Sequence, residues 1–268
     1  DCPTAKPISL ASVKRTTKRA CPDFGAVNAI TVCTRAKGGF TDEHLALLRW
    51  VVRPLTRVGE TFALMRTAVN LLNTYVGRNA GERILKGSIQ VGDTESIRCV
   101  IWFSDLRGFT LLSGSSTPAE TIALLNELFE CQVANIESQG GEVLKFMGDG
   151  MLAIFPIDAK REAAAAALAA SQAARDAFAA LGKLNQARTG RGAGPINFGV
   201  SLHVGEVAYG NIGGSSRLDF TAIGASVNLA SRIEGLTGKL GKSLLLSQEL
   251  AAILPLPTRS VGSYELKG

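Results

Sequence analysis

Two aspartates at the ends of strand-like apolar runs place the strongest constraint on how this chain can fold. Asp105 follows Trp102-Phe103-Ser104, and Asp149 stands between two glycines in Gly148-Asp149-Gly150. Because Asp and Gly tolerate the backbone of tight turns, the second motif predicts a hairpin between two strands. A fold that joins the two strand ends would set two carboxylates side by side, and paired carboxylates can hold divalent cations.

Each aspartate taken alone also fits a purely structural role. Asp149 between glycines is typical of a turn residue, and Asp105 fits a cap for the Arg107-Gly108 that follows it. Metal binding becomes the stronger interpretation when the two aspartates are taken together, each within its surrounding sequence block.

The bulk composition indicates a folded protein and disfavours several classes of function. Of the 268 residues, 46% are hydrophobic, which is enough for a sizeable core. The net charge of +6 arises in residues 1–92, which hold 14 Lys and Arg against 6 Asp and Glu. These basic residues are not interleaved with aromatic ones, so we expect a solvated basic surface and no nucleic-acid partner. No run of about 18 apolar residues occurs, so we expect no membrane span in this fragment.

Cysteine usage and the first residue bear on the cellular context. The five cysteines form no C-x-x-C pair, and their number is odd. This usage is typical of reduced thiols, so we expect a cytoplasmic protein. The chain begins with Asp rather than Met, and we interpret it as a fragment of a longer protein that upstream segments could tether.

The sequence pattern divides the chain into three segments. Residues 1–42 resemble the C-terminal end of a GAF-type sensor domain, with a strand at 26–34 and a helix that starts at Thr41-Asp42. Residues 43–92 are expected to form a signalling helix followed by a linker that contains four glycines. Residues 93–268 carry both aspartates and are expected to form the main domain.

Apolar residues recur every seven positions in the second segment, which predicts an amphipathic helix from 43 to about 76. The recurring residues are Leu48, Leu55, Phe62, Val69 and Val76. Pro54 should kink this helix or begin a new one. The stripe fits either a self-pairing coiled coil or packing onto a neighbouring domain.

The third segment alternates strand and helix patterns in the order β-α-β-β-α-β. The strongest helix start is Thr117-Pro118-Ala119-Glu120, where Thr caps and Glu closes a capping box. We expect strands at 98–104, 142–146, 151–155, 219–223 and 244–246, a strand pair broken near Gly205 at 196–212, a flexible loop at 189–194, and helices at 117–139, 158–181 and 226–236. This order predicts an α+β fold of the ferredoxin-like split βαβ type.

Three sequence blocks in this segment resemble the signature of class III adenylate and guanylate cyclases. The blocks are FSDLRGFT at 103–110, KFMGDG at 145–150 and DFTAIGASVNLASR at 219–232. They occur in the order and at the spacing of that family, and the likeness covers nearly all of residues 98–268.

The resemblance implies an adenylate cyclase. Such an enzyme converts ATP to 3′,5′-cyclic AMP and pyrophosphate by two-metal-assisted attack of the ribose 3′-hydroxyl on the α-phosphate. It implies two Mg²⁺ or Mn²⁺ ions per site, held by Asp105, Asp149 and the backbone carbonyl of Leu106. The turn after the first strand would cradle phosphate oxygens through Gly108, Phe109 and Thr110.

The same resemblance assigns the base, the ribose and the developing charge. Lys145 and Thr221 would read adenine, because Lys can donate to N1 of adenine, whereas guanine carries a donor there and suits Glu. Asn228 would bind the ribose and Arg232 the charge on the α-phosphate, and their spacing of four places them on one helix face. Lys267 would contact the triphosphate.

The resemblance also implies a head-to-tail homodimer with two equivalent sites for ATP. One chain would supply Asp105 and Asp149, and its partner would supply Lys145, Thr221, Asn228, Arg232 and Lys267. Two alternatives stay open: a guanylate cyclase, which Lys145 disfavours, and a catalytically silent dimeric regulatory module. The chain retains every expected site position, which disfavours the silent module.

Overall fold

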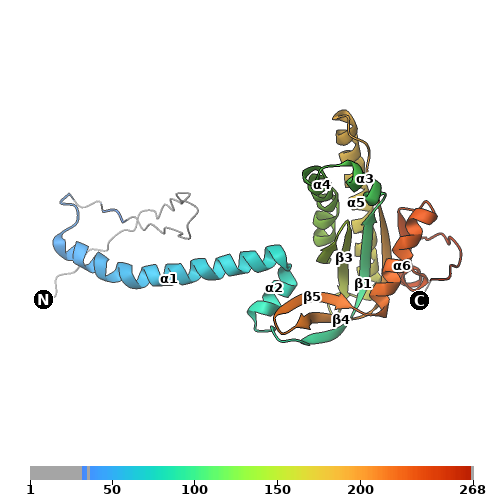
Figure 1. The fold of residues 1–268 in the computed structure, drawn as a ribbon. Helices are drawn as coiled ribbons and strands as arrows, with labels where there is room; N and C mark the ends of the chain where they lie inside the picture. The colour runs from blue at the N-terminus through green and yellow to red at the C-terminus, as the bar shows by residue number, and fades with distance from the viewer. Residues whose placement is uncertain (1–31, 35–36, 267–268) are drawn as a thin grey trace. The chain divides into compact units, whose positions relative to one another are not determined.

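A computed structural model describes residues 32–34 and 37–266 of the chain (Figure 1). The described residues divide into two compact units, one that ends at Leu71 and one that begins at Leu72. Most of the proposed sensor-domain remnant, including residues 26–31 of its expected strand at 26–34, lies outside the described residues. Within the described part of the chain, no helix is long and apolar enough to cross a membrane. The three cysteines that the structure describes, Cys33, Cys99 and Cys131, are free thiols.

The helix predicted for the second segment is α1 (Asp42–Tyr75). It begins where the sequence predicted, since the backbone N–H of His44 donates to the Thr41 hydroxyl at 3.3 Å. The helix runs through Pro54 as one element, so no new helix begins there. Many of its large apolar side chains are exposed, among them Trp50, Leu55, Phe62, Leu64 and Tyr75.

The expected glycine-rich linker contains a helix, α2 (Arg78–Leu85), which packs against the sheet of the second unit. Gly77 turns the chain into α2 with a φ of 92°, in the left-handed region that favours glycine. Ala80 is fully buried, and the Asn79 amide donates to the buried Glu142 carboxylate at 3.0 Å. Tyr209 donates to the same carboxylate at 2.8 Å. These contacts join residues that are far apart in the sequence, so local sequence patterns do not predict them.

The second unit is built on a six-stranded sheet with the order β2-β3-β1-β4-β5, in which β6 pairs with β4. The strands are β1 (Thr94–Leu106), β2 (Glu142–Met147), β3 (Gly150–Ile157), β4 (Phe198–Gly214), β5 (Arg217–Ile223) and β6 (Leu244–Leu246). The central strand β1 is antiparallel to both neighbours, and β6 is parallel to β4. The order of β1 to β4 and the helices between them confirm the predicted ferredoxin-like α+β fold.

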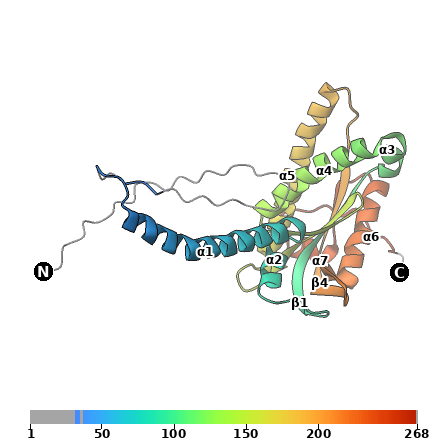
Figure 2. The ribbon, with the colours of Figure 1, turned by 60° about the vertical axis from the view of Figure 1, so that its left-hand side comes forward.

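Helices cover both faces of this sheet. They are α3 (Phe109–Ser115), α4 (Pro118–Ser138), α5 (Ala163–Gly190), α6 (Ala225–Lys239) and α7 (Gln248–Ile253). α4 and α5 cover one face, over a core that contains Trp102, Phe155 and Phe198 (Figure 1). α6 lies on the opposite face, where Cys99 and Ile101 belong to a second apolar cluster (Figure 2). Side chains of β1 alternate between the two faces, so consecutive residues serve different layers.

Local capping signals were read correctly at the start of α4. The Thr117 hydroxyl accepts from the backbone N–H of Glu120, and the Glu120 carboxylate accepts from the backbone N–H of Thr117, which is the predicted capping box. The end of α5 was predicted too early, at 181. The helix continues to Gly190, and ion pairs from Arg188 and Arg191 to Glu127 of α4 hold this extension in place.

The prediction of a broken strand pair at 196–212 was wrong, because β4 is one strand of 17 residues. Gly205 allows α6 to pack closely on β4 and does not interrupt the strand. A Cβ atom at this position would lie 2.6 Å from the Cβ atom of Ser226 on α6. The missing side chain therefore allows α6 to approach the strand, which decides where the residues of α6 stand.

Candidate active site

The structure brings together the two aspartates that the sequence singled out. Asp105 is the penultimate residue of β1, and Asp149 lies in the turn between β2 and β3. Gly148, with a φ of 65°, allows this turn to close. Gly150 lies against Asp105, because a Cβ atom there would be 3.2 Å from the Asp105 carboxylate. Besides burial, the charge of Asp149 raises the pKa of Asp105, as expected for two carboxyl groups that lie close together.

Burial and repulsion make this pair of carboxylates electrostatically unfavourable when no cation is bound. Burial, followed by the negative charges of Asp149 and Glu234, raises the pKa of Asp105 to about 7. A hydrogen bond from the backbone N–H of Leu106 acts in the opposite direction. A divalent cation would remove this repulsion, so the donor set fits a hard metal ion.

The protein alone offers few ligands to such an ion. Among the described residues, no group of three or more His, Cys, Asp or Glu side chains is arranged to hold a metal. Mg²⁺ is commonly held by one or two carboxylates together with waters and substrate phosphates. The residues present therefore fit a cation that is completed by the Leu106 carbonyl and by the oxygens of a bound nucleotide.

Of the two residues predicted to contact the base, Lys145 lies on β2 and Thr221 lies on β5. The Lys145 ammonium lies 3.6 Å from the carboxylate of Asp219, and both side chains are partly exposed. Thr221 lies two residues after Asp219 on β5, so the two side chains share one face of the strand. Lys145 pairs with Asp219 although Asp149 is only four residues away along the hairpin.

The Thr221 hydroxyl is a buried polar group without a hydrogen-bond partner within the described chain. The residue is only 2% exposed. A buried hydroxyl without a hydrogen-bond partner costs free energy, and such groups in native proteins commonly bind a ligand or a water molecule.

The residues predicted to act on the ribose and the phosphate lie on α6. Asn228 and Arg232 are both exposed and are four residues apart on one helix face. Gly108 precedes α3 in the left-handed conformation, with a φ of 73°, and begins the predicted phosphate turn of Gly108, Phe109 and Thr110. Lys267 lies outside the described residues.

Comparison with known proteins identifies the fold as that of a cyclase. Residues 92–268 match the family model of the adenylate and guanylate cyclase catalytic domain. The chain belongs to this cyclase family. It is similar to an adenylate cyclase of Anabaena cylindrica, with 35% identity over 170 residues, or 63% of this chain and 33% of that protein. The chain thus spans about a third of the length of this curated relative.

Solved cyclase structures resemble the same region. The adenylyl cyclase CyaB from P. aeruginosa aligns with a TM-score of 0.59 and 28% identity, over 65% of this chain and 90% of that one. The guanylyl cyclase Cya2 aligns with a TM-score of 0.55 and 32% identity, over 63% of this chain and 84% of that one.

Two charged residues of this cyclase domain escaped the sequence analysis. Asp219 pairs with Lys145, and its place two residues before Thr221 on the same strand was the available signal. Glu234 follows Arg232 by two residues on α6 and is 9% exposed. Burial raises the pKa of Glu234, whereas a hydrogen bond from Thr237 and the charge of Arg107 lower it.

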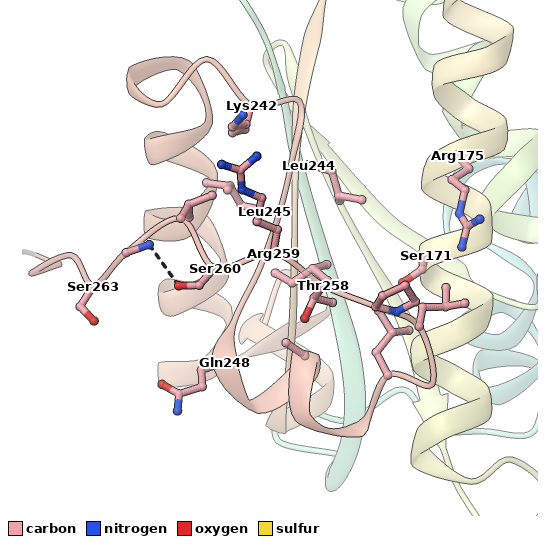
Figure 3. Close-up of a pocket in the computed structure, with 17 residues that line it drawn as sticks. Ser171, Arg175, Lys242, Leu244, Leu245, Gln248, Thr258, Arg259, Ser260 and Ser263 are labelled. Atoms are coloured by element: carbon pink, nitrogen blue, oxygen red, sulfur yellow. Dashed lines mark hydrogen bonds between the residues drawn. The ribbon is translucent and has the colours of Figure 1, made fainter.

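A cavity of about 890 Å³ in the cyclase domain lies away from these residues (Figure 3). It is bounded by α5, β6, α7 and the segment after α7, and none of the predicted site residues that the structure describes lines it. Figure 3 shows Arg175 projecting from α5 on one side, with Lys242 and Arg259 on the other. This cavity is therefore separate from the aspartate pair.

Proposed function

We propose that this cyclase domain is an adenylate cyclase, which converts ATP to 3′,5′-cyclic AMP and pyrophosphate. In this reaction the ribose 3′-oxygen forms a bond to the α-phosphorus, the bond to the pyrophosphate oxygen breaks, and the 3′-hydroxyl loses its proton. The observation that carries the proposal is the half-buried, mutually repulsive pair of Asp105 and Asp149 at the joined strand ends. Divalent cations held there would activate the 3′-hydroxyl and neutralise the triphosphate.

The choice of ATP rests on the residues that face the base. The Lys145 ammonium, held beside Asp219, can donate to N1 of adenine, which is an acceptor. The unsatisfied Thr221 hydroxyl can accept from the adenine amino group. Guanine presents a donor at N1, so a lysine at this position fits it less well.

The remaining roles follow from charge and position. We assign Asn228 to the ribose and Arg232 to the negative charge that develops at the α-phosphate, where a fixed cation lowers the barrier. The turn of Gly108, Phe109 and Thr110, together with Lys267, would contact the phosphates. These groups act in a homodimer, where one chain supplies the aspartates and its partner supplies the base, ribose and phosphate contacts.

Guanylate cyclase is the second candidate, since the guanylyl cyclase Cya2 is 32% identical over the aligned region. Purified protein assayed separately with ATP and GTP, with Mn²⁺ and with Mg²⁺, decides between the two. We expect the cyclic AMP formed from ATP to exceed the cyclic GMP formed from GTP at equal substrate concentrations. A preference for GTP would replace the adenylate assignment with the guanylate one.

Two variants test the assigned roles in the same assay. Asp105→Ala and Arg232→Ala should each lower the rate of cyclic AMP formation by about a hundredfold or more. Glu137→Gln, at an exposed carboxylate on α4, is the matched control and should keep the parental rate. Full activity of Asp105→Ala would remove the metal assignment, and inactivity of the parental chain would favour the silent regulatory module.

We further propose the division into a sensor remnant (1–42), a signalling helix with its linker (43–92) and the catalytic domain (93–268). In this arrangement α1 transmits the state of upstream segments to the catalytic domain. Replacing Leu48, Leu55 and Phe62 by Ser should change the rate of cyclic AMP formation while ATP still binds. An unchanged rate across that series would contradict the transmission role.

A further inference from the structure

Glu234 stands on the side of α6 that faces the sheet, and the packing of α6 on β4 fixes its position. The Ser201 hydroxyl of β4 donates to the backbone carbonyl of Ala230 at 2.7 Å. Gly205 leaves room for Ser226 at the start of the helix, where a Cβ atom would collide with it. Residues 226, 230 and 234 recur every four positions, so Glu234 continues the same helix face one turn further along β4.

The glycine beneath Glu234 is the cross-strand partner of Asp105. Gly199 of β4 lies directly opposite Asp105 of β1 in the antiparallel register. Side chains of such partners point to the same face of a sheet, with Cβ atoms about 4.5–5.5 Å apart. A Cβ atom at Gly199 would lie 2.5 Å from Oε1 of Glu234, so this carboxylate oxygen occupies the space of the missing side chain. Glu234 therefore lies beside the Asp105 side chain.

Glycines lie next to Asp105 on both neighbouring strands, and at each of them a carboxylate oxygen lies close to where a Cβ atom would be. On the β3 side, Gly150 lies so close that a Cβ atom there would be 3.2 Å from Oδ1 of Asp105. This glycine closes the turn that carries Asp149. On the β4 side, Gly199 makes room for Glu234. The missing side chains of Gly150 and Gly199 thus leave room for the carboxylates of Asp105 and Glu234 next to the turn that carries Asp149.

This convergence is electrostatically costly for the protein alone. Asp149 repels Glu234, and Glu234 repels Asp105. The Thr237 hydroxyl donates to Glu234 Oε1 at 3.0 Å and the charge of Arg107 offsets part of the repulsion. A neutral glutamine would fill the same space and accept the same hydrogen bond at lower electrostatic cost. A cation bound nearby would compensate the negative charge of Glu234, which explains why a glutamate stands here rather than a glutamine.

We propose that Glu234 is a positioning residue for the cation site: its charge, held beside Asp105, strengthens the binding of divalent cations by Asp105 and Asp149. It is not a ligand, because no three such side chains among the described residues are arranged around one metal position. The inference rests on the proposed function, since it concerns the same aspartate pair. Residues just outside a metal's ligands commonly tune its affinity in this way.

The test is direct measurement of Mn²⁺ binding by electron paramagnetic resonance, with the 268-residue chain and 3′-deoxy-ATP, which lacks the attacking hydroxyl. Glu234→Gln should raise the Mn²⁺ dissociation constant by about tenfold or more. Glu234→Asp, which keeps the charge, should stay closer to the parental value. Glu142→Gln is the matched control, because Glu142 is also a buried carboxylate but is held by α2 and β4, and it should bind Mn²⁺ as the parental chain does.

The outcomes separate this inference from the proposed function. If Glu234→Gln binds Mn²⁺ as tightly as the parental chain, the role of Glu234 is overturned. The same holds if Glu142→Gln weakens Mn²⁺ binding as much as Glu234→Gln does. Both results leave the cyclase assignment intact. No Mn²⁺ binding by the parental chain overturns the cation site itself and the inference with it. If Glu234→Gln does not fold, Thr237→Val decides, because it removes the hydrogen bond that orients Glu234. Weaker Mn²⁺ binding by Thr237→Val supports the inference, and unchanged binding overturns it.

Discussion

Replacing Asp105 by Asn should stabilise the cation-free protein at neutral and alkaline pH, although it removes a residue of the proposed active site. The pKa of Asp105 rises from 3.8 to about 7, chiefly because of burial and then because of the charge of Asp149. The folded state therefore disfavours the ionised carboxylate. This penalty is absent below about pH 4, where the group is protonated in both states, and it is complete above about pH 7.

The magnitude follows from the same shift. At about 1.4 kcal/mol per pH unit, the full shift corresponds to roughly 4 kcal/mol against the ionised form. The carboxylate is only half-buried, and solvent screens such interactions, so we expect about 1–2 kcal/mol. The asparagine side chain would carry no charge at any pH, and it would retain a carbonyl that can accept the hydrogen bond from the backbone N–H of Leu106.

The assay is urea unfolding of the parental chain and Asp105→Asn, with EDTA present, at pH 4.5 and pH 8. We expect the parental free energy of unfolding to fall relative to that of the variant as the pH rises. Added Mn²⁺ with nucleotide should reverse the order at pH 8, since only the parental chain would gain from the cation. A variant that is less stable than the parental chain at pH 8 in EDTA would refute the electrostatic argument.

Three further predictions concern other contacts. Tyr209→Phe removes a donor from the buried Glu142 and should lower the free energy of unfolding by about 1–3 kcal/mol, measured in urea; an unchanged value would contradict this. Gly205→Ala should cost about 1–3 kcal/mol by pushing α6 from β4, and the added change Ser226→Gly should restore part of the loss; calorimetric melting tests both. Lys145→Ala should lower kcat/KM for ATP by about tenfold or more and leave that for GTP less affected, and equal losses would argue against base reading.

Local chemistry explains why much of the fold was predictable. The capping box of Thr117 and Glu120 acts within one helical turn, and the β2–β3 turn depends on glycines next to Asp149. Short continuous apolar runs, as in β1 and β3, then specify strands whose two faces are both covered. The order of these elements limits the topology, because connections between strands are short and handed.

Predictions failed where a residue's meaning depends on a distant partner. Gly205 has the sequence character of a break, yet it lies in a continuous strand because Ser226 packs against it. The glycines at 77–93 suggest a flexible linker, yet the segment contains α2, which gains its stability from Glu142 and the buried Ala80. An isolated helix of this length would be marginal in water, so tertiary packing decides its existence.

The candidate site divides in the same way. The sequence alone determined the strand ends that carry Asp105 and Asp149, and the helix that presents Asn228. Turns and helix caps depend on residues that are neighbours in the sequence. Only the tertiary structure decided that Glu234 lies beside Asp105. That placement depends on the register between β1 and β4 and on the close approach of α6, and both are set by packing between segments that are far apart in the chain.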